Sequence, residues 1–195
     1  MNFDYYKDII RKKLDDYRYN HSLCVANEAK RLSALYNENQ TNAYLAGLLH
    51  DITKNFTREE HLNIFNQFDI ILTDVEKKSD KLWHSISGAA YVKNVLHIED
   101  ENIISAIRYH TTAKSGMSLF EKLIYLADFT SADRDYPDVD VMRSLVNKSL
   151  DAAMIYSLRY TIGDLTKKGR LIHPDTLGAY NETLIKTMEN ACEIR

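Results

Sequence analysis

Apolar residues recur at spacings of three and four along most of this chain, and little interrupts them. Within residues 21–36, for example, Val25, Ala29 and Leu32 fall on one face of a helix. Only six Gly and two Pro occur in 195 residues, so few residues of the kind that end helices are present. The nearest approach to a strand, residues 70–72, is too short to carry a sheet. The sequence therefore predicts an all-α fold.

Several expected helices have recognisable boundaries. Two residue pairs have the spacing of a capping box: Thr57 with Glu60, and Ser118 with Glu121. Thr41 precedes the apolar run 43–49, so we expect a helix to start near it. Residues 130–140 are rich in Asp and form the most loop-like segment.

Composition narrows the classes of protein that the chain can belong to. The length fits one domain, and a formal charge of -3 argues against general binding of nucleic acid. Cys24 and Cys192 lie far apart and form no CxxC pair, which favours a reducing compartment. The sequence has neither a secretory signal nor an apolar run of about 18 residues that could span a membrane. We therefore expect a cytoplasmic protein without a membrane partner; its oligomeric state stays open, a homodimer included.

Four of the seven histidines and two aspartates lie on different expected helices or at their ends. In chain order these residues are His21, His50, Asp51, His84, His110 and Asp128. His50 and Asp51 close the helix that starts near Thr41, and Asp128 follows the apolar run 123–127. A helical bundle can bring such side chains together in its centre.

This set of side chains favours a centre of two metal ions. Imidazole and carboxylate without thiolate suit iron, manganese, zinc or magnesium. Six ligands exceed what one tetrahedral metal needs, and Asp51 is the natural bridge because a carboxylate can join two ions. Two metals about 3.5–4 Å apart can lower the pKa of a shared water and stabilise an in-line phosphoryl displacement. The set therefore predicts hydrolysis of phosphate esters or anhydrides.

The segments around these residues resemble the HD superfamily and, within it, the bacterial YqeK family. The resemblance runs from residues 18–22 to 173–176. It is carried by residues 46–54 (AGLLHDITK), 83–89 (WHSISGA), 107–112 (IRYHTT) and 121–128 (EKLIYLAD). It implies a single HD domain over residues 1–195, with a metal-binding core at about 18–130 and C-terminal helices at about 138–195 that complete the bundle.

The resemblance also implies an activity, namely symmetrical cleavage of diadenosine tetraphosphate into two ADP molecules at a di-metal centre usually described as iron. By analogy with the family, His21, His50, Asp51 and Asp128 would bind one metal, and His84, His110 and the shared Asp51 the other. The chain departs from the family pattern at two places on the expected substrate side. Ala113 stands where Gly is usual, and Ser131-Ala132-Asp133 stands for Glu-Pro-Gly.

Two other functions fit the same residues. One is a different HD phosphohydrolase, such as a nucleotidase acting on (deoxy)nucleoside phosphates. The other is a non-catalytic nucleotide-binding module in which the metals only stabilise the helical bundle. A cyclic-dinucleotide phosphodiesterase fits less well, because no Gly-Tyr-Pro segment follows the core.

Basic residues near the motifs are candidates for binding the phosphates of a nucleotide substrate. Lys54 lies three residues beyond Asp51 and could share its face if the helix continues; the alternative is a solvated lysine at a helix end. Arg134 and Arg18 could bind phosphate through forked donors, although either could instead form a surface ion pair. We assign Asp51, Lys54 and Arg134 to catalysis, and Arg18, Lys54 and Arg134 to substrate binding.

Three further residues are expected on the substrate side. The hydroxyl groups of Thr111 and Thr112 could donate hydrogen bonds to phosphate, or these residues could cap the next helix. His173 could contact the nucleotide or act as a proton donor, while Pro174 after it is typical of the first position of a helix.

Overall fold

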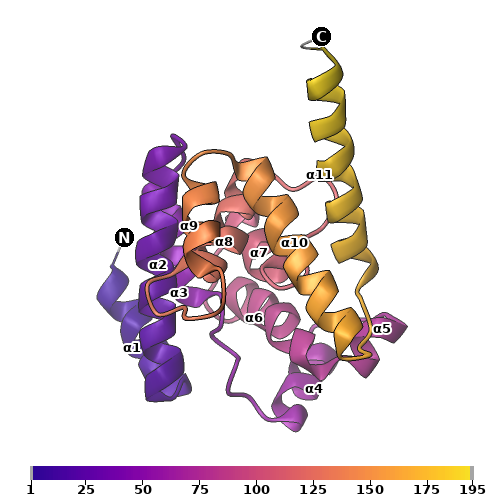
Figure 1. Ribbon diagram of the computed structural model, residues 1–195. Coiled ribbons are helices and arrows are strands. Elements are labelled where there is room, and N and C mark those ends of the chain that lie inside the picture. The colour runs from indigo at the N-terminus through magenta and orange to yellow at the C-terminus, as the bar shows by residue number, and fades with distance from the viewer. Residues whose placement is uncertain (1, 194–195) are drawn as a thin grey trace.

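The computed structural model describes residues 2–193, with side chains up to residue 190, and every regular element in this range is helical (Figure 1). The elements are α1 (Phe3–Lys13), α2 (Asp16–Leu35), α3 (Gln40–Leu49), α4 (Arg58–Gln67), α5 (Asp74–Lys78), the 3-10 turn η1 (Asp80–Leu82), α6 (Trp83–Asn94), α7 (Glu101–Tyr109), α8 (Leu119–Thr130), α9 (Val139–Val146), α10 (Leu150–Lys167) and α11 (Pro174–Glu193). The all-α prediction is confirmed. The side chain of Cys192 lies outside the described part.

One continuous core joins helices from both ends of the chain. Helix α2 packs against α3 and α8, while α7 and α10 also contact α8. Ile10 of α1, Leu48 of α3, Leu126 of α8 and Leu158 of α10 are fully buried in this core. Burial of so many large apolar side chains holds these helices in fixed positions.

Helices α2 and α3 approach each other closely at Gly47. A Cβ atom at this position would lie 2.8 Å from the Cα of Ala26. The absence of a side chain therefore allows the end of α3, with the residues that follow it, to lie directly against α2.

A smaller apolar cluster lies beside the main core. Ile64 and Phe65 of α4 pack there against Trp83 and Ile86 of α6. The indole Nε1 of Trp83 donates a hydrogen bond of 2.7 Å to the carbonyl oxygen of Glu76 in α5. The cluster thus fixes α5 and η1 against the start of α6.

Most helix boundaries follow the capping signals in the sequence. Thr57 and Ser118 form capping boxes at α4 and α8, as predicted. The helix expected near Thr41 begins at Gln40. Asn39 is its N-cap, because the Asn39 side chain accepts a hydrogen bond from the backbone N–H of Asn42. No described helix is both long enough and apolar enough to cross a bilayer.

Candidate metal centre

The fold brings all six predicted metal-binding residues to one place in the core. His21 belongs to α2, His84 to the first turn of α6 and Asp128 to α8. His50 and His110 are the C-cap residues that directly follow α3 and α7, and Asp51 follows His50. Five of them are buried, and the Asp128 side chain is 18% exposed. Side chains from five helices and their ends therefore share one site.

The six residues form overlapping groups of three that could each hold a metal ion. Within each group, the potential ligand atoms lie within 4.8 Å of one another. The groups are His21, His50 and Asp51; Asp51, His84 and His110; and His50, His110 and Asp128. His50, Asp51 and His110 each belong to two groups, and of these three only Asp51 has two oxygens with which to bridge two metals.

Unpaired buried atoms indicate that a cation completes this cluster. Within the described part of the chain, His50 Nε2 and Asp51 Oδ1 are buried without a hydrogen-bond partner, and His84 Nε2 lies 3.2 Å from His110 Nε2. Buried polar atoms nearly always have a partner, and imidazole nitrogens with carboxylate oxygens are suitable donors for a divalent metal. The residues present therefore fit a site for divalent metal.

Backbone hydrogen bonds orient two of the imidazoles toward the cluster. His50 Nδ1 lies 2.7 Å from the carbonyl oxygen of Gly47, and His110 Nδ1 lies 2.7 Å from that of Ile107. A carbonyl oxygen only accepts, so each Nδ1 carries a proton, and in the neutral imidazole Nε2 is then the nitrogen with the lone pair. Such outer contacts fix the tautomer and ring orientation that a metal requires.

His21 is oriented by the carboxylate of Asp133, which the sequence pattern does not predict as a site residue. Its Nδ1 lies 2.7 Å from Asp133 Oδ2, and Ser131 Oγ donates a hydrogen bond of 2.7 Å to Asp133 Oδ1. The only signal in the sequence was that residues 131–133 depart from the family pattern. A carboxylate behind an imidazole is a common arrangement next to a metal.

The charges in the cluster are arranged as metal binding requires. Burial lowers the pKa of His50 to about 3 and that of His84 to about 4. Although burial opposes it, the neighbouring His50 and His110 help to hold the pKa of Asp51 well below its usual value. Asp51 is thus ionised while His50 and His84 are neutral, and these are the protonation states in which carboxylate and imidazole bind metals.

His21 differs from the other imidazoles. Although burial opposes it, hydrogen bonds with Asp128 and Asp133 raise the pKa of His21 to about 9. Its Nε2 lies 2.9 Å from Asp128 Oδ1, so a proton holds these two atoms together. A metal between them would take the place of that proton.

The three predicted basic residues surround the cluster. Lys54 Nζ lies 2.9 Å from His84 Nε2 and 3.5 Å from Asp51 Oδ1, and burial lowers the pKa of Lys54. Arg18 Nη1 lies 3.4 Å from Asp51 Oδ2, and Arg134 pairs with the Asp128 carboxylate. Helix α3 ends at Leu49, so Lys54 reaches the site through a turn in which its N–H donates to the Asp51 carbonyl oxygen at 2.8 Å.

The remaining predicted residues lie together along a neighbouring cavity. Thr111, Thr112 and His173 all line it. The threonines do not cap the next helix, because Ser118 caps α8. Pro174 begins α11, as predicted.

The backbone at Ala113 explains why glycine would suit that position. Its φ is 55°, in the left-handed region that favours glycine. Asp133, which also stands where the family has Gly, does not have a positive φ. Only the first substitution therefore demands an unusual backbone conformation.

The fold and the site together define an HD domain. The family model for the HD domain matches residues 18–133, and the chain belongs to this family. It is 37% identical over 178 residues to the "Bis(5'-nucleosyl)-tetraphosphatase, symmetrical" of Halalkalibacterium halodurans, in a match that covers 91% of this chain and 95% of that protein. The protein of the same name from Bacillus subtilis is 34% identical, over 88% of this chain and 92% of its own.

A solved structure has the same fold. It is described as a predicted HD superfamily hydrolase involved in NAD metabolism from Clostridium acetobutylicum. It is 34% identical in sequence and superposes with a TM-score of 0.92, covering 95% of this chain and 98% of its own.

Proposed function

We propose that this chain is a metal-dependent hydrolase that cleaves diadenosine tetraphosphate symmetrically into two ADP molecules. The observation that carries the proposal is the buried cluster around Asp51, in which His50 Nε2 and Asp51 Oδ1 have no hydrogen-bond partner among the described residues. Relatives named for this activity match the chain over about nine-tenths of its length.

We assign the metals to the residues as the resemblance to the family implies, and two of the three groups of potential ligands agree with this assignment. His21, His50, Asp51 and Asp128 would hold one ion, and His84, His110 and the shared Asp51 the other. When bound, the ions would activate water and offset the charge of the phosphates. Iron is our preferred metal, with manganese, zinc and magnesium as alternatives, because histidine and carboxylate accept all of them.

The basic residues would bind and orient the phosphate chain. Lys54 and Arg18 lie on the Asp51 side of the cluster and Arg134 on the Asp128 side. Positive groups on both sides can stabilise the negative charge that develops around the attacked phosphorus. We also propose that residues 1–195 act as one domain, because a single core contains residues from α1 to α11.

Product analysis tests the proposed reaction. Metal-loaded protein should convert diadenosine tetraphosphate to ADP alone, as followed by anion-exchange chromatography. ATP with AMP would contradict symmetrical cleavage, and turnover restricted to nucleoside monophosphates would instead indicate a nucleotidase. A protein that binds metal but hydrolyses none of these nucleotides would favour the non-catalytic module.

Replacing Asp133 with Asn should weaken metal binding. The neutral amide would replace the carboxylate that pairs with His21 Nδ1. Loss of such a contact typically costs about 10- to 100-fold in metal affinity. The measurement is competition for Mn²⁺ with a chelator. Asp135→Asn, two residues further along the same loop, is the control; equal affinities of the two variants would contradict the assignment.

A further inference from the structure

Two cavities of similar size meet at the turn η1. Each has a volume of about 520 Å³, within the range of pockets that bind small molecules. Asp80 and Lys81 of η1 line both cavities. We call the one that reaches α4 the α4 cavity, and the one that reaches the start of α11 the α11 cavity.

The α4 cavity opens onto the metal centre. Arg18, Lys54 and His84 line it, and all three lie within 3.5 Å of the Asp51 carboxylate. At its other side, the guanidinium carbon of Arg58 lies 4.6 Å from the centre of the Trp83 ring. The cavity therefore leads from the metals to a cationic and aromatic wall.

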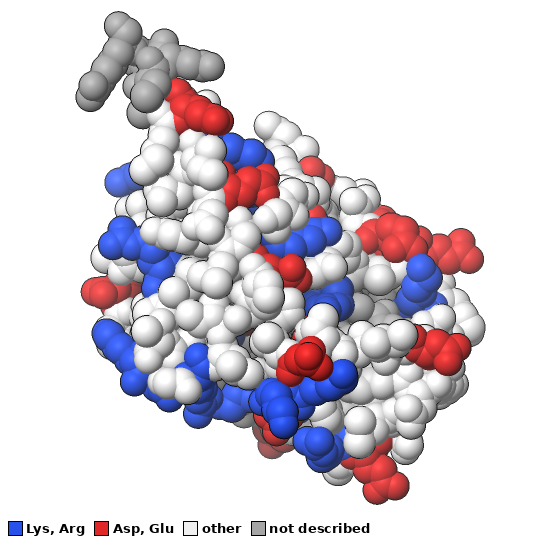
Figure 2. Space-filling model, turned by 90° about the vertical axis from the view of Figure 1, so that its right-hand side faces the viewer, with Lys and Arg blue, Asp and Glu red and all other residues white. Residues whose placement is uncertain are grey.

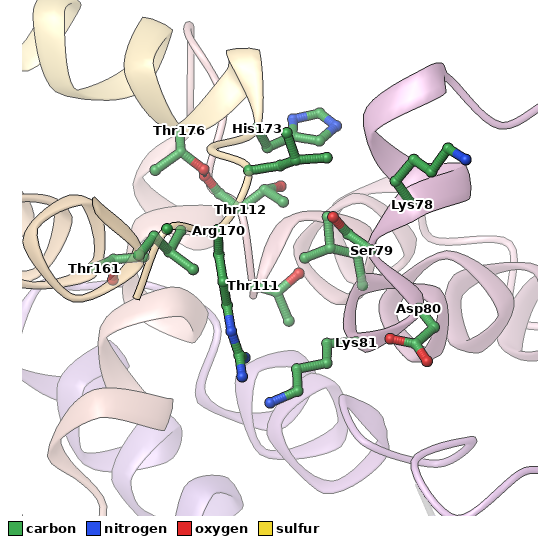
Figure 3. A pocket seen from close by; sticks show the side chains of 14 residues that line it. Lys78, Ser79, Asp80, Lys81, Thr111, Thr112, Thr161, Arg170, His173 and Thr176 are labelled. Atoms are coloured by element: carbon green, nitrogen blue, oxygen red, sulfur yellow. The ribbon is translucent and has the colours of Figure 1, made fainter. Parts of the chain in front are cut away.

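The α11 cavity lies beside the residues that follow His110. Thr111 and Thr112, which directly follow that histidine, line it together with Arg170. In Figure 3 the charged ends of Arg170 and Lys81 extend toward the same space beneath Thr111. Two cationic groups from distant segments thus converge beside the end of α7.

Both cavities carry an excess of positive charge, although the chain as a whole carries -3. Arg18, Lys54, Arg58 and Lys81 line the α4 cavity, and Lys78, Lys81 and Arg170 line the α11 cavity. Of the acidic residues that the structure describes, Asp80 alone lines either one. Lys and Arg side chains also gather along the lower left edge of the face shown in Figure 2. A cavity lined by an excess of positive charge attracts a polyanion.

Central cleavage of a symmetrical substrate gives two halves of equal size, one on each side of the attacked bond. Water adds across the middle P–O–P bond: its oxygen bonds to one phosphorus, and the bond from that phosphorus to the bridging oxygen breaks. The other phosphate leaves with the bridging oxygen, and the protons of the water are released to solvent. Each half is then an ADP, so equal halves must extend in two directions from the attacked bond. A single cavity at the metals would hold only one of them.

We propose that the α4 and α11 cavities each bind one nucleoside diphosphate half of the substrate, with Lys81 contacting the phosphate chain where the cavities meet. This inference rests on the proposed function. Arg58 serves only the α4 cavity and Arg170 only the α11 cavity. The two halves can therefore be tested separately.

Calorimetric titration of metal-loaded protein with ADP tests the assignment without turnover. The unaltered protein should bind two ADP per chain. Arg58→Ala and Arg170→Ala should each weaken one of the two sites by about tenfold, the loss expected for one hydrogen bond to a charged group. Lys81→Ala should weaken both. Lys77→Ala is the control, because Lys77 is exposed, pairs with Asp74 and lines neither cavity.

Steady-state kinetics with diadenosine tetraphosphate should agree with the titration. Each of the three variants should raise KM by about tenfold, with kcat within about threefold of the control. Binding of one ADP per chain, or variants indistinguishable from Lys77→Ala in a protein that hydrolyses the substrate, would overturn the inference. Two ADP sites in a protein that does not hydrolyse the substrate would support the cavities and contradict the proposed function.

Discussion

Replacing Asp51 with Asn should abolish hydrolysis. Asp51 belongs to two of the groups of potential metal ligands, and Asn has nearly the same shape but no charge with which to bridge two cations. We expect kcat/KM to fall by at least about a thousandfold, or about 4 kcal/mol of transition-state stabilisation. Metal content should fall from two ions per chain to one or fewer, as measured by elemental analysis.

A matched substitution on the surface separates this effect from a general loss of charge. Asp140 is exposed and pairs with Arg143, so Asp140→Asn should keep both metals and full activity. An Asp51→Asn protein that retains two metals and turns over substrate at the rate of the control would contradict the role given to Asp51.

Replacing Gly47 with Ala should destabilise the whole fold. The new Cβ would lie 2.8 Å from Ala26 Cα and 3.0 Å from Val25 O. Both contacts are with backbone, so α2 and α3 must separate. We expect the free energy of unfolding to fall by about 2–3 kcal/mol, as other overpacked cores do. Metal affinity should fall too, because the Gly47 carbonyl oxygen orients His50.

Gly163 provides the control for this substitution. It lies inside α10, and apart from its chain neighbours and the nearby backbone of its own helix no described atom lies within 4 Å of where its Cβ would be. Gly163→Ala should therefore raise the free energy of unfolding, by up to about 1 kcal/mol, since alanine favours helices more than glycine does. Urea denaturation measures both changes; shifts of the same sign for the two variants would contradict the account of helix packing.

The sequence predicted the members of the metal cluster because local signals mark them. His50, Asp51 and His110 lie where apolar helices end, and these ends can be recognised from spacing alone. A continued helix would place Lys54 on the face of Asp51; Lys54 instead follows a turn, yet it still reaches the site. A separation of three residues brings side chains near one another in both conformations.

Asp133 was not predicted as a site residue because its contact depends on long-range geometry. It meets His21 across 112 residues, through a loop that carries no periodic pattern. Arg170 and Lys81 were missed for a similar reason. They share a cavity only because the connection between α10 and α11 comes near η1 in the folded chain. Side chains on exposed loops have no local signal that indicates which element they will face.

This cluster should hold two metals, and hydrolysis should depend on both. The most direct test is to remove metal from anaerobically purified protein, add back Fe²⁺ or Mn²⁺ in steps, and measure bound metal and ADP formation on the same samples. We predict two ions bound per chain, and ADP formation that reaches its maximum only as the second ion binds. Full activity in metal-free protein, or with a single ion per chain, would contradict the claim.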